Sequence, residues 1–549
     1  MKKVIGKRII SLVLAMLICV SVSGGMPTYA ADLKEGTTVT PDADSPTGYT
    51  VQFVYKNETA EQVQLCGDLS LLNIANIGTS DSAVRLEPEA WQTGLYHTGG
   101  KEFIREMVKD ENGYWTASIP MHAGALSYWY RVWDSSKGWV NQRIWDPASS
   151  NVRPTATDVN DNGTPYRTKY NDVLDAVYVP YDEKQNDEAL ASRAKYELPI
   201  ADEAKKGTVQ YIPYTTVLGG EGYNLGVYLP AGYDAERAEP YKVVYAAHGI
   251  FGDETDWMVP GSTPNILDNM IANGEIEPTV FVTMGNHFTP PTTEGGKPSY
   301  NQNNAARNLV EAILPKIEAD YNVSTERTGR AYIGFSMGGM TGTSVLTNYA
   351  DEFGYYGLMS GGGNFNDANL NSIVAAAGTK VPFIFMGRGA FEGDLKTLNA
   401  TKDKLASLGI PSETALVPGA HDMMTAGQLF TKFAKEYLWK EIDANPFTIL
   451  TDNVLDRTGG NITATVKVDL TEDVTTHSGD EVVIFQLMKG DTPVSIVGLK
   501  RDITTQEEFT AYFNVDAKDT TYSVRVFVFD SFNSDLTAPV SLAAQKVLK

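Results

Sequence analysis

Residues 330–346 read Arg-Ala-Tyr-Ile-Gly-Phe-Ser-Met-Gly-Gly-Met-Thr-Gly-Thr-Ser-Val-Leu. The first six residues predict a buried strand, and the last ten predict a helix with small residues on its packing side. Between them Gly334, Ser336 and Gly338 form the Gly-x-Ser-x-Gly pattern of a nucleophile elbow, a sharp turn that presents a serine hydroxyl at its tip. Strand, turn and helix occur in the required order. The stretch therefore predicts Ser336 as a nucleophile rather than an ordinary turn residue.

Around this stretch, from residue 207 to residue 443, short apolar runs alternate with longer helical stretches. Such alternation is typical of an α/β domain with a mainly parallel sheet. Helices are expected at 304–321 and 395–408. The expected buried strands are Lys242–Ala247, Thr279–Met284, Ala331–Phe335, Tyr355–Met359, Pro382–Met386 and Glu413–Val417.

A serine nucleophile needs an imidazole that takes its proton and an acid that orients the imidazole. In enzymes with this elbow the chain order is Ser, acid, His. Within 207–443 the only histidine after Ser336 is His421, on a loop just after an expected strand. The loop after the strand at 382–386 offers two carboxylates. We choose Glu392 as the acid and keep Asp394 as the second choice.

Acyl transfer also needs backbone N–H groups that stabilise the oxyanion. One donor is expected at Met337, directly after the nucleophile, and the other at Ile250, on the loop after the strand ending at residue 247. Trp257, Asn286 and His287 lie beside strand ends and are expected to contribute to the acyl pocket. No Cys or His spacing suits a zinc site, so we expect neither a metal nor an organic cofactor.

Two further β-type segments flank this domain. Residues 31–152 and 447–549 alternate short β-type runs with turns and predict two β-sandwiches, whereas 153–206 is polar and predicts a linker with one short helix. Six of the eight tryptophans fall in the first segment, at positions 91, 115, 129, 133, 139 and 145. These rings would either hold sugar rings or fill the sandwich core, and the sequence leaves both readings open.

The first thirty residues have a basic head, an apolar run and a small-residue cleavage site near Ala30, as in a secretory signal. With Cys19 inside this signal, Cys66 is left alone, so no intramolecular disulfide is expected. The pattern predicts a secreted bacterial protein.

Removing the four cations of the signal changes the net charge from −23 to −27, which argues against nucleic acid and membranes as partners. The composition, 42% hydrophobic and 21% charged, is that of an ordinary globular protein.

The central segment resembles the esterase-D-like α/β hydrolases, particularly the secreted carbohydrate esterases of family 1, which include feruloyl and acetyl xylan esterases. The resemblance implies Ser336 as nucleophile, His421 as base, and Ile250 and Met337 as oxyanion donors. Glu392 aligns with one form of the family's acid loop, and Ala390 occupies the acid position of the other form. The matching pieces are Tyr228–Tyr233, His248–Trp257, Asn265–Asn269, Ile313–Glu318, Gly334–Gly339 and Gly419–Asp422.

The first flanking segment resembles the family 48 carbohydrate-binding modules through Leu65–Asp68, Asn112–Trp115 and Tyr128–Val132. In esterases that carry it, such a module can pack against the catalytic domain and shape its site instead of binding polysaccharide. The second flanking segment, 447–549, matches no family that we would name.

Together these observations predict an α/β hydrolase between two β-sandwiches. The expected activity is that of a serine esterase that releases hydroxycinnamic acids such as ferulate from plant cell-wall polysaccharide. The expected partner is an acylated polysaccharide or oligosaccharide, or a small-molecule ester. An acetyl xylan esterase or other small-ester hydrolase stays open, as does a non-catalytic glycan-binding protein with a decayed hydrolase domain. The sequence does not indicate the oligomeric state.

Overall fold

A sheet of eight strands forms the centre of the chain, in the order β12-β13-β15-β14-β16-β17-β18-β19. Pairing is parallel from β15 to β19 and antiparallel where β13 joins β12 and β15. The strands are β12 Thr208–Tyr214, β13 Tyr223–Leu229, β14 Lys242–Ala247, β15 Thr279–Met284, β16 Arg330–Phe335, β17 Tyr355–Met359, β18 Phe383–Gly389 and β19 Ser412–Val417. All six strands expected from the sequence are present.

The structure is a computed structural model, in which the residues from Glu35 to Lys549 form one compact unit. The predicted secretory signal lies outside the described residues, so secretion stays a prediction. The described residues are 33–73, 75, 84–99, 102–136, 138–139, 143–152, 174–218, 223–250, 252–286, 301–442, 444–472, 474, 479, 481–531 and 540–549.

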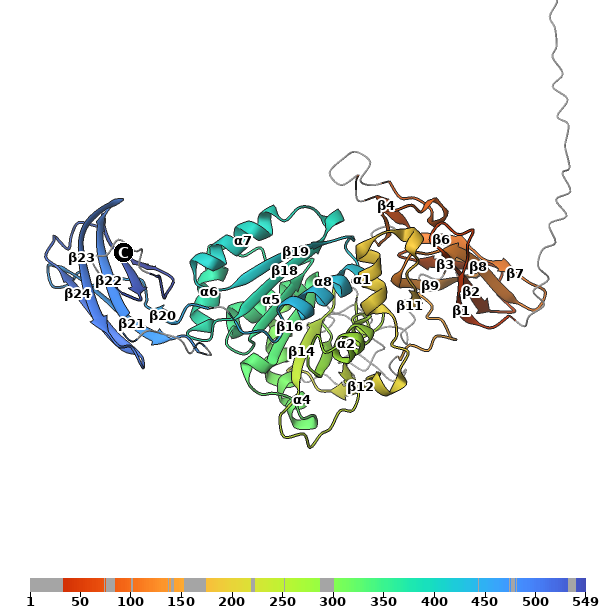
Figure 1. The fold of residues 1–549 in the computed structure, drawn as a ribbon, viewed down its shortest axis with the longest axis horizontal. Coiled ribbons are helices and arrows are strands. Elements are labelled where there is room, and N and C mark those ends of the chain that lie inside the picture. Colours follow the sequence, from red (N-terminus) through yellow and green to blue (C-terminus); the bar gives the residue numbers. More distant parts are fainter. Residues whose placement is uncertain are drawn as a thin grey trace, which may run out of the picture. The chain divides into compact units, whose positions relative to one another are not determined.

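Helices cover both faces of the central sheet (Figure 1). One apolar core packs residues of α3 to α7 on one face, and a second packs residues of α1, α2 and α8 on the other. The segment expected as one helix at 304–321 contains α3 and α4, joined by a π-helical turn at Leu309–Ile313. The helices are α1 Glu188–Glu197, α2 Thr263–Ala272, α3 Gln302–Asn308, α4 Leu314–Asp320, α5 Met337–Tyr349, α6 Asp367–Ala377, α7 Lys396–Ser407 and α8 Met423–Glu436.

The N-terminal segment contains a four-stranded sheet, β1-β2-β8-β7, and a five-stranded sheet in which β10-β9-β3-β6 is extended by β11 pairing with β9. All these pairings are antiparallel. The strands, including the separate pair β4-β5, are β1 Gly36–Pro41, β2 Tyr49–Lys56, β3 Val63–Gly67, β4 Leu71–Asn73, β5 Leu95–His97, β6 Phe103–Glu106, β7 Val108–Lys109, β8 Tyr114–Pro120, β9 Gly124–Asp134, β10 Gly138–Trp139 and β11 Asp175–Val179.

The C-terminal segment contains two further antiparallel sheets, β20-β21-β24 and β23-β22-β25-β26, which enclose their own apolar core. The fold class expected from the sequence is therefore confirmed: a mainly parallel α/β sheet with antiparallel β regions before and after it. The strands are β20 Phe447–Leu450, β21 Ile462–Leu470, β22 Glu481–Lys489, β23 Thr492–Arg501, β24 Glu507–Phe513, β25 Tyr522–Phe529 and β26 Lys546–Leu548.

The segment expected as a linker, 153–206, contributes structure to both neighbouring domains. Its strand β11 pairs with β9 of the first sandwich. Its helix α1 supplies Tyr196 to the core of the central domain. The polar composition of the segment did not indicate that it packs with both domains. Pairing with a strand that is distant in the sequence leaves no local pattern.

Most tryptophans of the first sandwich are buried, for example Trp115 in its own core and Trp145 in the core of the central domain. Trp91, Trp115, Trp129 and Trp145 are buried. Trp133 and Trp139 are half-buried, and their rings contact each other edge to face. Of the two readings left open by the sequence, core filling accounts for the four buried rings.

Cys66 is buried in the first sandwich, where burial raises the pKa of its thiol to about 12. It is therefore a packing residue and not a reactive thiol.

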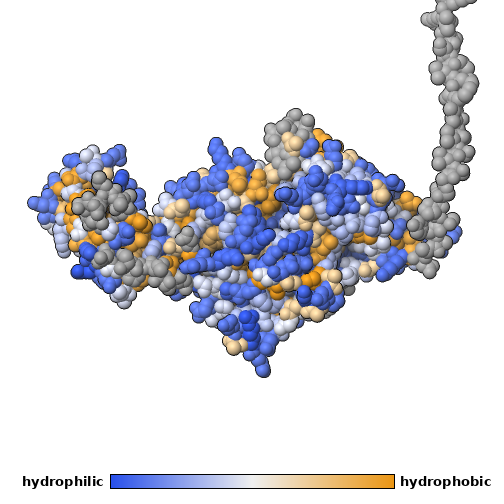
Figure 2. All heavy atoms as spheres, viewed as in Figure 1, coloured by the Kyte–Doolittle hydropathy of each residue, from blue (hydrophilic) through white to orange (hydrophobic). Residues whose placement is uncertain are grey.

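No helix in the described part of the chain is both long and apolar enough to span a membrane. Hydrophilic residues dominate the face of the molecule seen in Figure 2.

Candidate active site

Ser336 lies at the turn between β16 and α5, where its backbone adopts φ 53° and ψ −110°. A non-glycine residue at positive φ is strained, and such strain is commonly found at functional sites. The turn leaves no room for side chains on either side of the serine. A Cβ on Gly334 would lie 2.2 Å from the carbonyl of Gly338, and a Cβ on Gly338 would lie 2.2 Å from the carbonyl oxygen of Ala247. The elbow predicted from the sequence is present.

His421 follows β19 and reaches the serine from the neighbouring loop. Its Nε2 lies 2.7 Å from Ser336 Oγ, and its ring packs on Phe335 with 4.9 Å between ring centroids. About half of the His421 side chain, 48%, is exposed. The imidazole is thus supported on one side and open to solvent on the other, where a substrate can enter.

Glu392 completes the chain of hydrogen bonds. Its Oε2 accepts the Nδ1–H of His421 at 2.7 Å, and its Oε1 accepts from the Ser360 hydroxyl at 2.6 Å and the Gly389 N–H at 2.8 Å. These donors hold the carboxylate in one orientation, and its side chain is only 15% exposed. The hydrogen bond that His421 donates to Glu392 is the main cause that raises the pKa of His421 above its ordinary value.

Asp394, the second choice for the acid, is exposed, and its Oδ1 accepts the backbone N–H of Lys396 at 3.0 Å. The structure brings Glu392 to the histidine, and Asp394 instead caps the turn before α7. The short helical turn Ala390–Glu392 decides between them, because it directs residue 392 back toward His421.

The two expected oxyanion donors lie beside the nucleophile. Met337 is the first residue of α5, so its N–H has no acceptor within the helix. The loop that carries Ile250 packs against the serine: a Cβ on Gly249 would lie 3.3 Å from Ser336 Cβ. Their roles as oxyanion donors stay predictions that this placement supports.

This arrangement can perform nucleophilic acyl transfer. Because Glu392 accepts the Nδ1–H, the unprotonated Nε2 of His421 faces Ser336 and can remove its hydroxyl proton. The imidazolium formed is stabilised by the carboxylate and can then protonate the leaving alcohol. Water can repeat the sequence on the acyl-enzyme.

A comparison with protein families supports this chemistry: residues 216–403 match the model of the family "Esterase". The matched segment contains the elbow and Glu392, and His421 lies on the loop after β19, the next strand of the same sheet. The central domain, residues 207–443, thus has the sheet of an α/β hydrolase and matches the esterase family over residues 216–403, and we call it the esterase domain below.

Curated proteins that are similar to this chain include two xylan-degrading enzymes by name. An endo-1,4-beta-xylanase/feruloyl esterase of Xylanibacter ruminicola is 29% identical over 233 residues, which are 42% of this chain and 31% of the relative. An endo-1,4-beta-xylanase Y of Acetivibrio thermocellus is 33% identical over 177 residues, which are 30% of this chain and 15% of the relative. The chain thus covers less than a third of the length of either protein.

Solved structures similar to the esterase domain include two feruloyl esterases. The feruloyl esterase module from Clostridium thermocellum complexed with sinapinate is 23% identical, with a TM-score of 0.38 over 45% of this chain and 92% of that one. A ferulic acid esterase from Anaeromyces mucronatus in complex with ferulic acid is 24% identical, with a TM-score of 0.36 over 44% of this chain and 94% of that one. The fold of the esterase domain is assigned from its sheet order and not from these scores.

Of the three residues expected in the acyl pocket, the structure describes two, and both are buried. Trp257 has no exposed surface, and its indole N–H donates to the Ala247 carbonyl, so the expectation that it lines the pocket is wrong. Asn286 is 1% exposed and donates to the carbonyl of His248 at 2.7 Å, so it fixes a loop of the esterase domain instead of contacting substrate. His287 lies outside the described residues.

Two polar residues near the site were not singled out from the sequence. Ser360 follows β17 and donates to Glu392; its position directly after a strand was a signal that could have identified it. Gln302, the first residue of α3, donates its amide N–H to the sulfur of Met337 at 2.8 Å. No sequence pattern points to Gln302, because the loop before it separates it from any strand end.

Within the described residues, no group of three or more His, Cys, Asp or Glu side chains is placed to hold a metal ion. The expectation that the reaction needs neither metal nor cofactor stays a prediction. The organic steps above use only side chains and backbone groups of the esterase domain.

Proposed function

We propose that this protein is a secreted serine esterase that releases hydroxycinnamic acids such as ferulate from acylated plant polysaccharides or oligosaccharides. One observation carries the proposal of ester hydrolysis: Ser336, His421 and Glu392 form an unbroken hydrogen-bonded chain, with both contacts of the histidine at 2.7 Å. A decayed hydrolase domain would have no reason to keep a strained serine aligned with a base and an acid. The geometry therefore favours an enzyme over a purely glycan-binding protein.

The substrate class is supported by the relatives. The Xylanibacter protein is named as both a xylanase and a feruloyl esterase, and the segment that it shares with this chain covers 42% of the chain. A xylanase and a feruloyl esterase act on the same plant polymer, which makes an ester on xylan the first substrate to test. Acetate esters on xylan use the same chemistry and differ only in the acyl pocket they need.

The test is the chromatographic detection of acids that the purified mature protein releases from feruloylated arabinoxylan and from acetylated xylan. A Ser336→Ala variant serves as the blank. Release of ferulate by the wild type alone is the expected result. Release of acetate alone would assign the protein to the acetyl xylan esterases, and release of neither acid would contradict both assignments.

Secretion is tested separately, by recovering the protein from the culture medium of a bacterial host and sequencing its N-terminus. A mature N-terminus close to residue 31 is expected. Retention of the full-length chain inside the cells would contradict this part of the proposal.

A further inference from the structure

The loop that carries His421 continues directly into α8, and the first sandwich holds the start of that helix. Asp422 is 6% exposed, and its Oδ2 accepts two hydrogen bonds at 2.8 Å, from the Thr98 hydroxyl and from the Gly99 N–H. Thr98 has no exposed surface. Buried hydrogen bonds to a carboxylate are among the stronger contacts in proteins. Two residues of the N-terminal sandwich therefore bind the residue that directly follows the candidate base.

The two oxygens of Asp422 have separate partners. Oδ1 accepts the Thr425 N–H at 2.8 Å and caps the N-terminus of α8, whereas Oδ2 binds the sandwich. One carboxylate thus connects a helix of the esterase domain with a loop of the sandwich that is 324 positions away in the sequence. A helix cap alone would need only one of these oxygens.

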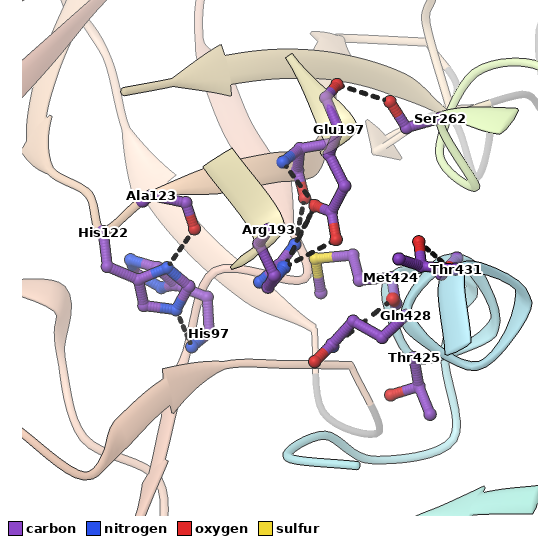
Figure 3. A network of polar contacts seen from close by, with 12 residues as sticks. His97, His122, Ala123, Arg193, Glu197, Ser262, Met424, Thr425, Gln428 and Thr431 are labelled. Carbon is purple, nitrogen blue, oxygen red and sulfur yellow. Dashed lines mark hydrogen bonds and ion pairs between the residues drawn. The ribbon is translucent and has the colours of Figure 1, made fainter. Parts of the chain in front are cut away.

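Apolar packing reinforces this connection. Met424, at the start of α8, is 3% exposed and belongs to the core of the sandwich, together with Leu126 and Val177. Figure 3 shows Met424 beside Arg193 of α1, between the helix and the strands of the sandwich. The side chain of Met424 is therefore packed in the sandwich core, whereas Met423 beside it packs in the core of the esterase domain.

A second contact keeps the sandwich in place relative to the esterase domain (Figure 3). Arg193 and Glu197 of α1 form a buried ion pair at 2.9 Å, and both also bind the backbone of Ala125 in β9. The carbonyl of Glu197 accepts from the Ser262 hydroxyl, just before α2 of the esterase domain. Thr98 and Gly99 thus belong to a domain that is anchored at two points.

The backbone around His421 has an anchor on each side. On one side the Gly419 carbonyl accepts the N–H of Phe391, next to Glu392. On the other side Asp422 is bound to the sandwich. Glu392 orients the imidazole ring, and these two anchors hold the backbone that carries it. The two anchors flank the residue whose Nε2 lies 2.7 Å from Ser336 Oγ.

We propose that Asp422 is a positioning residue for the base: held by Thr98 and Gly99, it makes the N-terminal sandwich part of the catalytic unit. The inference rests on the proposed esterase function. It concerns the chemical step and not the choice of substrate, because Asp422 acts through His421 and is too buried to contact a polysaccharide. Displacing the base weakens transition-state stabilisation and leaves ground-state binding of the ester intact.

The test measures kcat and KM for p-nitrophenyl acetate, a small ester that reports on the base without needing the polysaccharide. Thr98→Val removes the hydroxyl donor and keeps the size of the side chain. We expect kcat to fall about 10-fold, within the roughly 10²-fold that a misplacement near 1 Å can cost, with KM changed less than about twofold. Thr98→Ser restores the donor and should restore kcat.

Thr50→Val is the matched control, because the Thr50 hydroxyl also donates to an aspartate at 2.8 Å within the same sandwich, to Oδ2 of Asp42. It should leave kcat unchanged. The second test variant, Asp422→Asn, keeps an oxygen for the cap of α8 and turns an N–H₂ group toward two donors. It should lower kcat at least as much as Thr98→Val, and its thermal midpoint should fall below that of Thr50→Val, because two buried donors then face an amide N–H₂ group.

Three results would overturn the proposal: a kcat of Thr98→Val within twofold of wild type, an equal loss in Thr50→Val, or a loss that Thr98→Ser does not restore. Absence of any hydrolysis that depends on Ser336 would overturn both this proposal and the proposed function. Hydrolysis of the reporter ester without release of ferulate from arabinoxylan would contradict only the substrate assignment, and the comparison of Thr98 with Thr50 would still decide the role of Asp422.

Discussion

Glu392 reaches His421 with one carboxylate oxygen, at 2.7 Å from Nδ1, while its other oxygen is held by Ser360 and by the N–H of Gly389. The acid is therefore oriented before any substrate binds. A preorganised acid of this kind fixes the tautomer of the histidine and stabilises its cation when the serine proton is transferred.

This contact predicts a large difference between the two carboxylates of the acid loop. Glu392→Gln should lower kcat by about 10⁴-fold, because the amide no longer stabilises the imidazolium and favours the wrong tautomer. Asp394→Asn, the matched control, should keep kcat within a few-fold of wild type, since Asp394 only accepts a local backbone N–H. Steady-state kinetics on p-nitrophenyl acetate measures both. The reverse ranking would show that the resting geometry does not identify the acid.

The pH dependence of the reaction follows from the same pair. His421 must be neutral to act as the base, and Glu392 raises its pKa above the ordinary value of 6.5. As the pH falls, kcat/KM should therefore begin to decline above pH 6.5, and the midpoint of the acidic limb should lie above that value. A profile recorded from pH 5 to 9 measures the midpoint. A midpoint below 6.5 would mean that the hydrogen bond to Glu392 does not govern the protonation of His421.

Two buried histidines in the first sandwich predict a loss of stability in mild acid. Burial lowers the pKa of His97 to about 3 and that of His122 well below its ordinary value. Both residues stay neutral in the folded protein, whereas they bind protons below about pH 6.5 when unfolded. The contribution of the two histidines to the free energy of unfolding is therefore complete above pH 6.5. Below that pH the free energy of unfolding falls by about 1.4 kcal/mol per pH unit for each histidine.

His97→Asn tests this expectation, because an amide N–H can replace the Nδ1–H that His97 donates to the Leu69 carbonyl, and the Nε2 has no partner among the described residues. Denaturant unfolding followed by tryptophan fluorescence, between pH 5 and 6.5, should give a shallower pH dependence for the variant. Parallel curves for the variant and the wild type would show that His97 does not titrate on unfolding.

The tight elbow predicts that Gly338 tolerates no side chain. In Gly338→Ala the new Cβ would lie 2.2 Å from the Ala247 carbonyl oxygen, so β14 and α5 must separate, at a cost of about 1–3 kcal/mol or more. Gly459→Ala is the control, since a Cβ there meets no atom within 4 Å. Calorimetric melting of both variants checks the difference. Equal thermal midpoints for the two variants would contradict the packing described here.

Local sequence pattern determined the elbow, the positions of the parallel strands along the chain and the identity of the serine, and the chain order Ser, acid, His then pointed to His421. The elbow and each strand are encoded within about fifteen residues: an apolar run predicts a buried strand, and two glycines permit a turn that other residues would block. Because parallel strands place their carboxyl ends on one edge, Ser336 and His421 could be expected to meet.

Only the tertiary structure decided between Glu392 and Asp394, because both lie in one loop and the choice depends on which carboxylate faces His421, a residue that follows another strand. It also excluded Trp257 from the pocket, since burial is a property of the packed domain and not of the residue type. The contact of Asp422 with Thr98 could not have been foreseen either. It joins residues from two domains 324 positions apart, and no local periodicity records which surfaces pack together once the chain has folded.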